Sequence, residues 1–335
     1  MDYRNLGRTG VKVSPLCLGT MNFGGRTEES DAVEIIRRAI DAGINFIDTA
    51  NVYNDGESEK VVGKALGKDG LRDRIVLATK VYGPMGDGPN ERGIHRRHIR
   101  QQCEASLKRL GTDRIDLYQI HRPMSEIPID ETLRALDDLV RAGKVNYIGT
   151  STFAAWNLME SLMVAKELGL NRFVCEQPPY HPLDRRAERE LLPFCRTYGF
   201  GVIPWSPLAG GFLTGKYSRE GDWPSDSRFA QKEEKKRRDF QDAAFRVEEA
   251  VERFAKESDC TPSQWSLAWC MQQPGVTSPI IGPRTMEQLE DNLGALDVEV
   301  SDEQRAALDE AAPPGEVIVP FYEADFGPHQ CSVVT

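Results

Sequence analysis

Three polar residues each close an apolar run that has the composition of a β-strand. Asp48 follows INFI, Lys80 follows IVLAT and His121 follows IDLYQI. Each run is short and is followed by a helical pattern, as expected for parallel strands in βα units. Because the carboxyl ends of parallel strands meet at one edge, we expect the three side chains to face one cleft.

A tyrosine five residues after Asp48 adds a fourth polar group, Tyr53. A phenol is a poor acid at neutral pH, but a nearby ammonium such as Lys80 stabilises the phenolate and makes proton donation to a developing alkoxide feasible. Asp48 can hold Lys80 protonated through a charge-assisted hydrogen bond. His121 can orient a substrate carbonyl by a hydrogen bond. The four residues therefore predict an enzyme.

Each of these residues also has a purely structural explanation. A single tyrosine near a helix start is more often a packing residue, a lysine after a strand is usually solvated, and Asp48 can be a turn or N-cap residue. Three polar groups at the ends of consecutive strands, with a tyrosine just beyond the first, favour the catalytic interpretation over coincidence.

The composition is that of a globular protein. The chain has 335 residues, of which 40% are hydrophobic and 28% charged. No apolar stretch approaches the roughly 20 residues of a membrane helix, and the N-terminus lacks the apolar core of a secretion signal. Seven scattered cysteines without a C-x-x-C motif predict a cytoplasmic protein without disulfides. The net charge of −10 argues against nucleic acid as a partner.

One histidine pair has the spacing of a helical metal site. His95 and His98 are three residues apart, but Arg96, Arg97 and Arg100 surround them. A solvated basic helix start is the preferred interpretation, so no metal site is predicted.

Strand and helix patterns alternate along the chain, which favours a parallel sheet. Eight βα units predict a closed (β/α)8 TIM barrel, an α/β fold that accommodates the whole chain, 1–335, as a single domain. An open sheet would usually place a G-x-G-x-x-G turn after its first strand, and LGTMNFGG does not match it. The expected strands are 17–19, 44–48, 75–79, 115–121, 145–149, 173–175, 200–203 and 278–281, and the expected helices are 28–42, 57–67, 95–110, 129–142, 156–168, 185–198 and 285–295.

Additions to the barrel are expected at both ends and in its loops. LGRTGVKVS at 6–14 predicts an N-terminal β-hairpin. The stretches 81–94 and 206–240 are long enough to be binding loops at the C-terminal face. Ser301 is the expected cap of an extra C-terminal helix, followed by a tail, 313–335, that folds over one barrel face.

Several ordered motifs closely resemble the aldo-keto reductase family. They are GINFIDTANVY, GESE, LATK, DRIDLYQIH and GKVNYIGTS, spread over 43–151. The resemblance implies a (β/α)8 barrel that binds NADPH and reduces aldehydes or ketones. It makes Tyr53 the general acid, lets Lys80 and Asp48 tune it, and gives His121 the task of positioning the carbonyl.

The resemblance also implies a cofactor site. Ser151 and Gln177 correspond to groups that bind the nicotinamide carboxamide, and Trp205 and Tyr180 are the aromatic candidates near the ring. IGPRT opens a helix whose N-terminus suits an anionic 2′-phosphate. The full set of expected cofactor residues is Thr20, Met21, Asp48, Ser151, Gln177, Tyr180, Trp205, Ser206, Pro207, Leu208, Lys216, Arg228, Gly282, Arg284, Gln288, Asp291 and Asn292.

The chain departs from the family pattern at two of these positions. Thr152 stands where many relatives have Asn after the serine, and Arg284 stands where some have a small hydroxyl residue. For Gln288 and Asn292 a solvated helix face is the alternative.

The expected activity is NADPH-dependent reduction of a small-molecule carbonyl substrate. One alternative is an NAD(H)-preferring sugar or alcohol dehydrogenase. Another is an NADPH-sensing regulatory subunit with slow turnover, because relatives that match WSPLA include the β-subunits of potassium channels as well as sugar and aldehyde reductases. The sequence does not indicate the physiological substrate or the oligomeric state.

Overall fold

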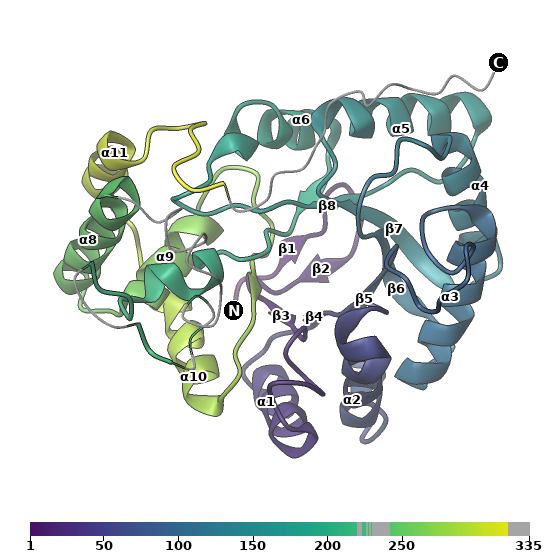
Figure 1. Ribbon diagram of the computed structural model, residues 1–335, viewed down its shortest axis with the longest axis horizontal. Coiled ribbons are helices and arrows are strands. Elements are labelled where there is room, and N and C mark those ends of the chain that lie inside the picture. The colour runs from purple at the N-terminus through teal and green to yellow at the C-terminus, as the bar shows by residue number, and fades with distance from the viewer. Residues whose placement is uncertain (220–222, 226, 228, 230–241, 321–335) are drawn as a thin grey trace.

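Eight of the strands form one parallel sheet that closes on itself. The computed structural model describes residues 1–219, 223–225, 227, 229 and 242–320. Within this part of the chain, eight strands pair in parallel in the order β10-β3-β4-β5-β6-β7-β8-β9. The backbone N–H of Ile280 donates to the carbonyl of Pro204 at 2.8 Å, which joins the two ends of the sheet. The expected (β/α)8 barrel is confirmed (Figure 1). The strands are β3 (Cys17–Gly19), β4 (Phe46–Asp48), β5 (Val76–Val81), β6 (Ile115–Ile120), β7 (Val145–Ser151), β8 (Cys175–Gln177), β9 (Gly201–Val202) and β10 (Ile280–Ile281).

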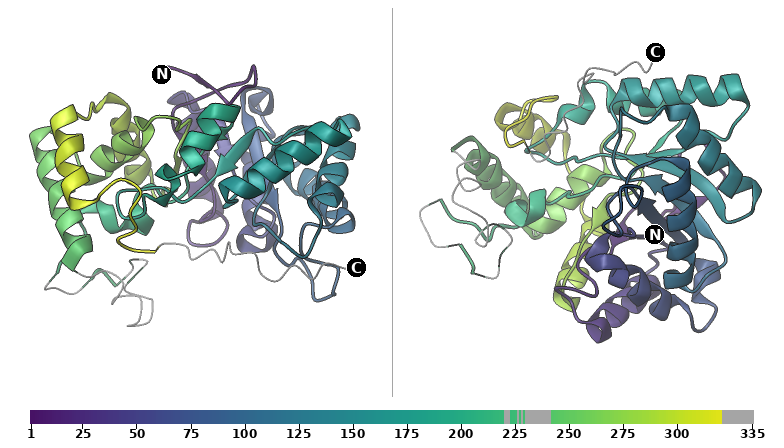
Figure 2. Two further views of the ribbon diagram at one scale, coloured as in Figure 1. Left: turned by 90° about the horizontal axis from the view of Figure 1, so that it is seen from above. Right: turned by 45° about the vertical axis from the view of Figure 1, so that its right-hand side comes forward.

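Helices surround the sheet, and most of them lie where the apolar periodicity predicts them (Figures 1 and 2). The α-helices of the described chain are α1 (Glu29–Asp41), α2 (Glu57–Leu66), α3 (Arg96–Leu110), α4 (Ile129–Arg141), α5 (Ala155–Leu168), α6 (Leu191–Tyr198), α8 (Asp242–Glu257), α9 (Pro262–Met271), α10 (Met286–Gly294) and α11 (Asp302–Ala311). Short 3-10 turns are η1 (Tyr53–Gly56), η2 (Leu71–Arg74), η3 (Arg186–Glu188), η4 (Ala209–Thr214) and η5 (Ala295–Asp297).

Two parts of the expected helix pattern are wrong. The helix predicted at 185–198 is divided into η3 and α6, because Glu190 between them has a φ of −137°, outside the helical range. The stretch after β9 contains α8 and α9, for which the sequence predicts no helix. The whole of α9 after Pro262 except Gln264 is buried, so this helix lacks the polar face on which a periodicity argument depends.

The N-terminal hairpin closes one opening of the barrel. Its strands β1 (Arg4–Asn5) and β2 (Lys12–Val13) pair antiparallel, and Figure 2 shows the hairpin on one side of the sheet. Leu6 and Val13 are fully buried among side chains inside the barrel, including Phe46 and Leu117. At Gly7, φ is +57° and an added Cβ would lie 2.5 Å from the backbone nitrogen of Gly201, so this close approach requires glycine.

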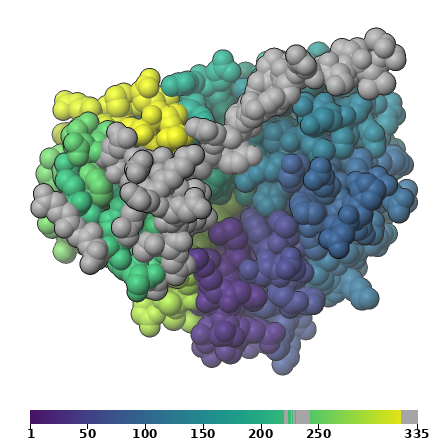
Figure 3. Space-filling model, in the orientation of Figure 1, coloured from purple at the N-terminus to yellow at the C-terminus, as the bar shows by residue number. Residues whose placement is uncertain are grey.

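The ring of helices closes where the first and last βα units meet. Arg38 on α1 forms an ion pair with Glu290 on α10 at 2.6 Å. Figure 3 shows the purple and light-green segments side by side at this place. The helices of the first and last βα units thus lie next to each other in the ring.

The C-terminal part of the described chain packs beside the carboxyl ends of the strands. Ser301 caps α11 in a capping box with Gln304, as expected from its position. Beyond this helix, the backbone N–H groups of Ile318 and Val319 both donate to the carbonyl of Leu183 at 3.0 Å. Residues 321–335 of the expected tail lie outside the described residues. In the described part of the chain, no helix combines the length and the apolar character needed to cross a membrane.

Candidate active site

The polar groups of the barrel interior follow from the alternation of side chains along a strand. Phe46, Ala78 and Leu117 belong to the apolar cluster inside the barrel. Side chains two residues further along each strand point to the same face, and these are Asp48, Lys80 and Gln119. Cys175 and Gln177 have the same relation on β8. The strands therefore deliver a group of buried polar side chains to the carboxyl end of the barrel.

Asp48, Lys80 and Tyr53 form a connected set at this end. Lys80 Nζ lies 2.5 Å from Asp48 Oδ2 and 3.2 Å from the hydroxyl of Tyr53, and it also donates to the carbonyl of Thr49 at 2.9 Å. The Lys80 side chain is fully buried. Burial alone would lower its pKa, but the charges and hydrogen bonds of Asp48 and Tyr53 outweigh burial and raise the pKa of Lys80. Lys80 is therefore an ammonium at neutral pH, as its expected role requires.

His121 contacts the ring of Tyr53. The two ring centroids are 5.7 Å apart and the rings meet edge to face. Burial, followed by the charges of Lys80 and Arg122, holds the pKa of His121 well below the usual value for histidine. A neutral imidazole at neutral pH can donate one hydrogen bond to a carbonyl oxygen without bringing a charge.

A left-handed turn follows Tyr53, which contacts both Lys80 and His121. Asn54 and Asp55 form this turn with φ of 49° and 54°, and the side chain of Asn54 donates to the carbonyls of Met21 and Phe23 at 3.0 and 2.9 Å. Asparagine and aspartate tolerate this conformation better than most residues. The loop after β3 and the turn after β4 are therefore held together around the tyrosine.

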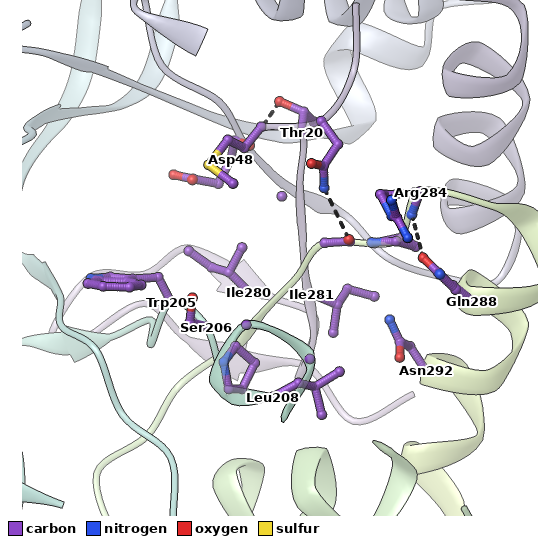
Figure 4. Close-up of a pocket in the computed structure, with 18 of the residues that line it drawn as sticks. Thr20, Asp48, Trp205, Ser206, Leu208, Ile280, Ile281, Arg284, Gln288 and Asn292 are labelled. Carbon is purple, nitrogen blue, oxygen red and sulfur yellow. Dashed lines mark hydrogen bonds between the residues drawn. The ribbon is translucent and has the colours of Figure 1, made fainter. Parts of the chain in front are cut away.

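These groups open into a cleft of about 1010 Å³ at the carboxyl ends of the strands. Tyr53 and His121 line it, whereas Lys80 lies behind them. Figure 4 shows Trp205, Ser206 and Leu208 on one side and Arg284, Gln288 and Asn292 at the far end, with Ile280 and Ile281 between. The expected cofactor residues that line the cleft are Thr20, Met21, Asp48, Ser151, Gln177, Trp205, Ser206, Pro207, Leu208, Lys216, Gly282, Arg284, Gln288, Asp291 and Asn292.

Tyr180 does not belong to this set. Its side chain is fully buried, its ring centroid lies 5.3 Å from that of Trp269 on α9, and its hydroxyl donates to Glu188 at 2.6 Å. Tyr180 therefore does not line the cleft, because its side chain packs against Trp269 in the hydrophobic core. Arg228 lies outside the described residues.

Other lining residues were missing from the sequence prediction, including Asn22, Arg26, Arg122, Ile280 and Pro283. Arg122 is tied to Thr152, the residue that departs from the family pattern. The Thr152 hydroxyl accepts from Arg122 Nη1 at 3.0 Å and donates to the carbonyl of Ser151 at 2.7 Å. Because the single donor of this hydroxyl is used within the protein, Thr152 can offer a ligand an acceptor but no donor.

The far end of the cleft is built from the start of α10. Thr285 caps the helix by accepting from the backbone of Gln288, and the Gln288 side chain accepts from the backbone N–H of Arg284 at 2.8 Å. Asp291 accepts from the hydroxyl of Thr261 at 2.8 Å. Gln288 and Asp291 thus stabilise this wall of the cleft as well as lining it.

The donor set at this end has the chemistry that an anionic ligand needs. Arg26, Lys216 and Arg284 line the cleft, whose acidic lining residues are Asp48 and Asp291. Lys216 folds against the loop after β9, where a Cβ on Gly211 would lie 2.9 Å from its ammonium nitrogen. Cationic side chains, a glycine-lined loop and a helix N-terminus are the usual elements of phosphate sites. The residues present therefore fit a dinucleotide whose phosphates lie at this end.

A buried carboxyl supports the turn that carries Ser151. Glu176 lies on the outer face of β8, accepts from the hydroxyl of Thr150 at 2.5 Å and from the backbone N–H of Phe153 at 3.1 Å. Burial raises the pKa of Glu176 to about 8, although these hydrogen bonds act in the opposite direction. The folded protein therefore retains a proton here that the unfolded chain releases near pH 4.5.

We expect this proton to make stability fall as pH rises. A carboxyl whose folded pKa is raised stabilises the fold fully below its unfolded pKa, and the contribution is lost as pH rises from about 4.5 to about 8. Urea unfolding of the wild type and of Glu176→Gln at pH 6 and pH 8.5 measures it. The wild type should lose stability relative to the variant by up to about 1.4 kcal/mol per pH unit, the limit for one proton. Parallel pH dependences would show that Glu176 does not retain the proton.

Comparison with known proteins decides the family. A model of the aldo/keto reductase family matches residues 15–313. The chain belongs to the aldo/keto reductase family. Its similarity to the uncharacterized oxidoreductase YrpG of Bacillus subtilis is 43% identity over 322 residues, covering 93% of this chain and 96% of that protein.

Two further relatives show how varied the family is. An aldo-keto reductase of Fusarium vanettenii is 36% identical over 345 residues, covering 94% of this chain and 92% of that protein. A probable voltage-gated potassium channel subunit beta of Oryza sativa is 39% identical over 303 residues, covering 89% of this chain and 92% of that protein. This aldo-keto reductase is thus an oxidoreductase by family, while its substrate has to be argued from its own residues.

Proposed function

We propose that this protein reduces aldehydes or ketones to alcohols by hydride transfer from NADPH, with Tyr53 as the general acid. The observation that carries the proposal is the position of the Tyr53 hydroxyl, 3.2 Å from a buried ammonium and at the wall of the cleft. An ammonium stabilises the phenolate that remains after the proton has left.

The residues around Tyr53 have distinct tasks in such a reaction. NADPH, when bound, supplies the hydride. The Tyr53 hydroxyl donates its proton to the carbonyl oxygen as negative charge develops there. Lys80 stabilises the resulting phenolate, and Asp48 keeps Lys80 charged and in place. The neutral imidazole of His121 donates a hydrogen bond that orients the carbonyl.

The cofactor would be held along the cleft by residues that already line it. Ser151 and Gln177 would bind the carboxamide and Trp205 would contact the ring. The loop at 206–208 and Lys216 would bind the pyrophosphate. Arg284 and the start of α10 would bind the 2′-phosphate.

Spectrophotometry of the purified protein tests the proposal. We expect NADPH absorbance to fall when members of a small panel of aldehydes and ketones are added, and to remain constant with no carbonyl compound present. Tight binding of NADPH with no turnover across the panel would contradict the proposed reductase activity.

The preference for NADPH over NADH is expected to depend on Arg284. Its planar, permanently charged fork suits phosphate oxygens, and the N-terminus of α10 adds a favourable field. Losing a charge-assisted hydrogen bond costs about 1.5–3 kcal/mol, which is roughly one to two decades in affinity. Arg284→Ala should therefore weaken NADPH binding by that factor and leave NADH binding almost unchanged, as measured by calorimetric titration. Equal weakening of both cofactors would assign the preference to other residues.

Two alternative functions remain distinguishable by the same measurements. Similarity to the rice protein named as a probable potassium channel subunit beta favours an NADPH-sensing regulatory subunit, which would bind NADPH tightly and turn over slowly. An NAD(H)-preferring sugar or alcohol dehydrogenase would bind NADH at least as tightly as NADPH and would oxidise alcohols.

A further inference from the structure

Asp48 has a second set of partners besides Lys80. Its Oδ1 accepts from Gln119 Nε2 at 2.9 Å and from Gln177 Nε2 at 3.0 Å. Gln177 Nε2 also donates to Gln119 Oε1 at 3.2 Å. All three side chains are almost fully buried, but Asp48 and Gln177 also reach the wall of the cleft. One carboxylate thus joins the ion pair behind Tyr53 to a residue of the expected carboxamide site.

The side-chain amide of Gln177 uses its donors inside the barrel and leaves its acceptor toward the cleft. A side-chain amide has two N–H donors on nitrogen and two acceptor positions on oxygen. Both donors of Gln177 point into the barrel, one to Asp48 and one to Gln119. Its Oε1 is therefore the polar atom that this side chain can offer to a ligand in the cleft.

The reverse orientation of the amide is excluded by charge. An aspartate paired with an ammonium is ionised and can only accept hydrogen bonds. Rotating Gln177 by half a turn would place its oxygen against that carboxylate and bury two facing acceptors. Gln119 faces the same constraint, so both amides have a single favourable orientation.

We propose that Asp48 sets the hydrogen-bond polarity of the cofactor site, by holding Gln177 so that only an acceptor faces the cleft, with Gln119 as a positioning residue. The inference rests on the proposed binding of a nicotinamide cofactor. The group opposite Gln177 must then be a donor, which is the amide N–H2 of the carboxamide. The catalytic carboxylate and the recognition of the nicotinamide are coupled through one atom, Asp48 Oδ1.

Calorimetric binding of NADP+ and of its 3-acetylpyridine analogue tests the coupling without any turnover. The analogue replaces the amide by an acetyl group and lacks the N–H2 donor. The wild type should bind NADP+ about two- to tenfold more tightly than the analogue, the effect of one hydrogen bond. In Asp48→Asn, Lys80 holds the amide oxygen and the new N–H2 group faces the glutamines. Gln177 must then turn its nitrogen to the cleft, so the ratio of the two affinities should fall to about one or below.

Lys80→Arg is the matched control, since it alters the same ion pair but keeps a cation opposite Asp48, so the Asp48 oxygens remain acceptors for both glutamines. It should retain the wild-type affinity ratio. Gln177→Met should bring the ratio to about one with Asp48 intact, which keeps the inference testable if Asp48→Asn does not fold. A folded Asp48→Asn or Gln177→Met protein with the wild-type ratio would overturn the inference. Failure of the wild type to bind either dinucleotide would instead refute the proposed function.

Discussion

Replacing Tyr53 by phenylalanine is expected to lower kcat by about 10²–10⁴, because it removes the general acid and keeps the ring. The edge-to-face contact with His121 needs only the ring, so the wall of the cleft should be preserved. Steady-state kinetics with an aldehyde found in the panel, together with the dissociation constant of NADPH, measures both consequences. The affinity for NADPH should stay close to that of the wild type.

A second tyrosine provides the control for this change. Tyr82 follows β5 and packs against the hydrophobic core without lining the cleft. Tyr82→Phe should leave kcat within about twofold. If Tyr53→Phe also retains most of the activity, the proton comes from another group and the assignment of Tyr53 is wrong.

Replacing Lys80 by methionine should have two large and separable effects. Removing one partner of a buried ion pair leaves Asp48 uncompensated and costs about 3–5 kcal/mol of stability. Losing the ammonium beside Tyr53 should lower kcat by about 10²–10³, the size found when one electrostatic stabiliser is removed. Urea unfolding measures the first effect and steady-state kinetics the second.

The double variant Lys80→Met, Asp48→Asn separates the two effects. It removes the unpaired charge, so much of the lost stability should return while kcat stays low. Recovery of activity together with stability would show that Lys80 acts only by supporting the fold.

Several residues at the carboxyl end of the barrel could be predicted, because a polar residue after a short apolar run marks the end of a strand in the sequence. Asp48, Lys80 and His121 were located by apolar runs, and parallel pairing brings the ends of such runs together whatever the details of the loops. Gln119 was missed although a signal existed. It lies between Leu117 and His121 in a period-two pattern, so its side chain had to point into the barrel.

The errors have a common physical origin in packing between distant segments. Tyr180 is three residues from Gln177, and nothing local indicates that its ring turns away to meet Trp269. The helix α9 is buried nearly all round, so its own sequence contains no polar face. Gln288 was expected as an adenosine contact, but its side chain also closes the turn before α10 through Arg284. Such partners become apparent only when both segments are placed in space.

The N-terminal hairpin covers the end of the barrel opposite the cleft. Leu6 and Val13 fill the bottom with hydrocarbon, and Lys80 above them has no exposed surface. Leu6 and Val13 lie at the hairpin end of the barrel, whereas Tyr53 lines the cleft at the carboxyl ends of the strands. If Tyr53 is the proton donor, as proposed, each proton that it gives away would be replaced through the same cleft that would admit the carbonyl compound and release the alcohol. Reprotonation and product exchange would then share one passage, so a ligand bound in the cleft would block both.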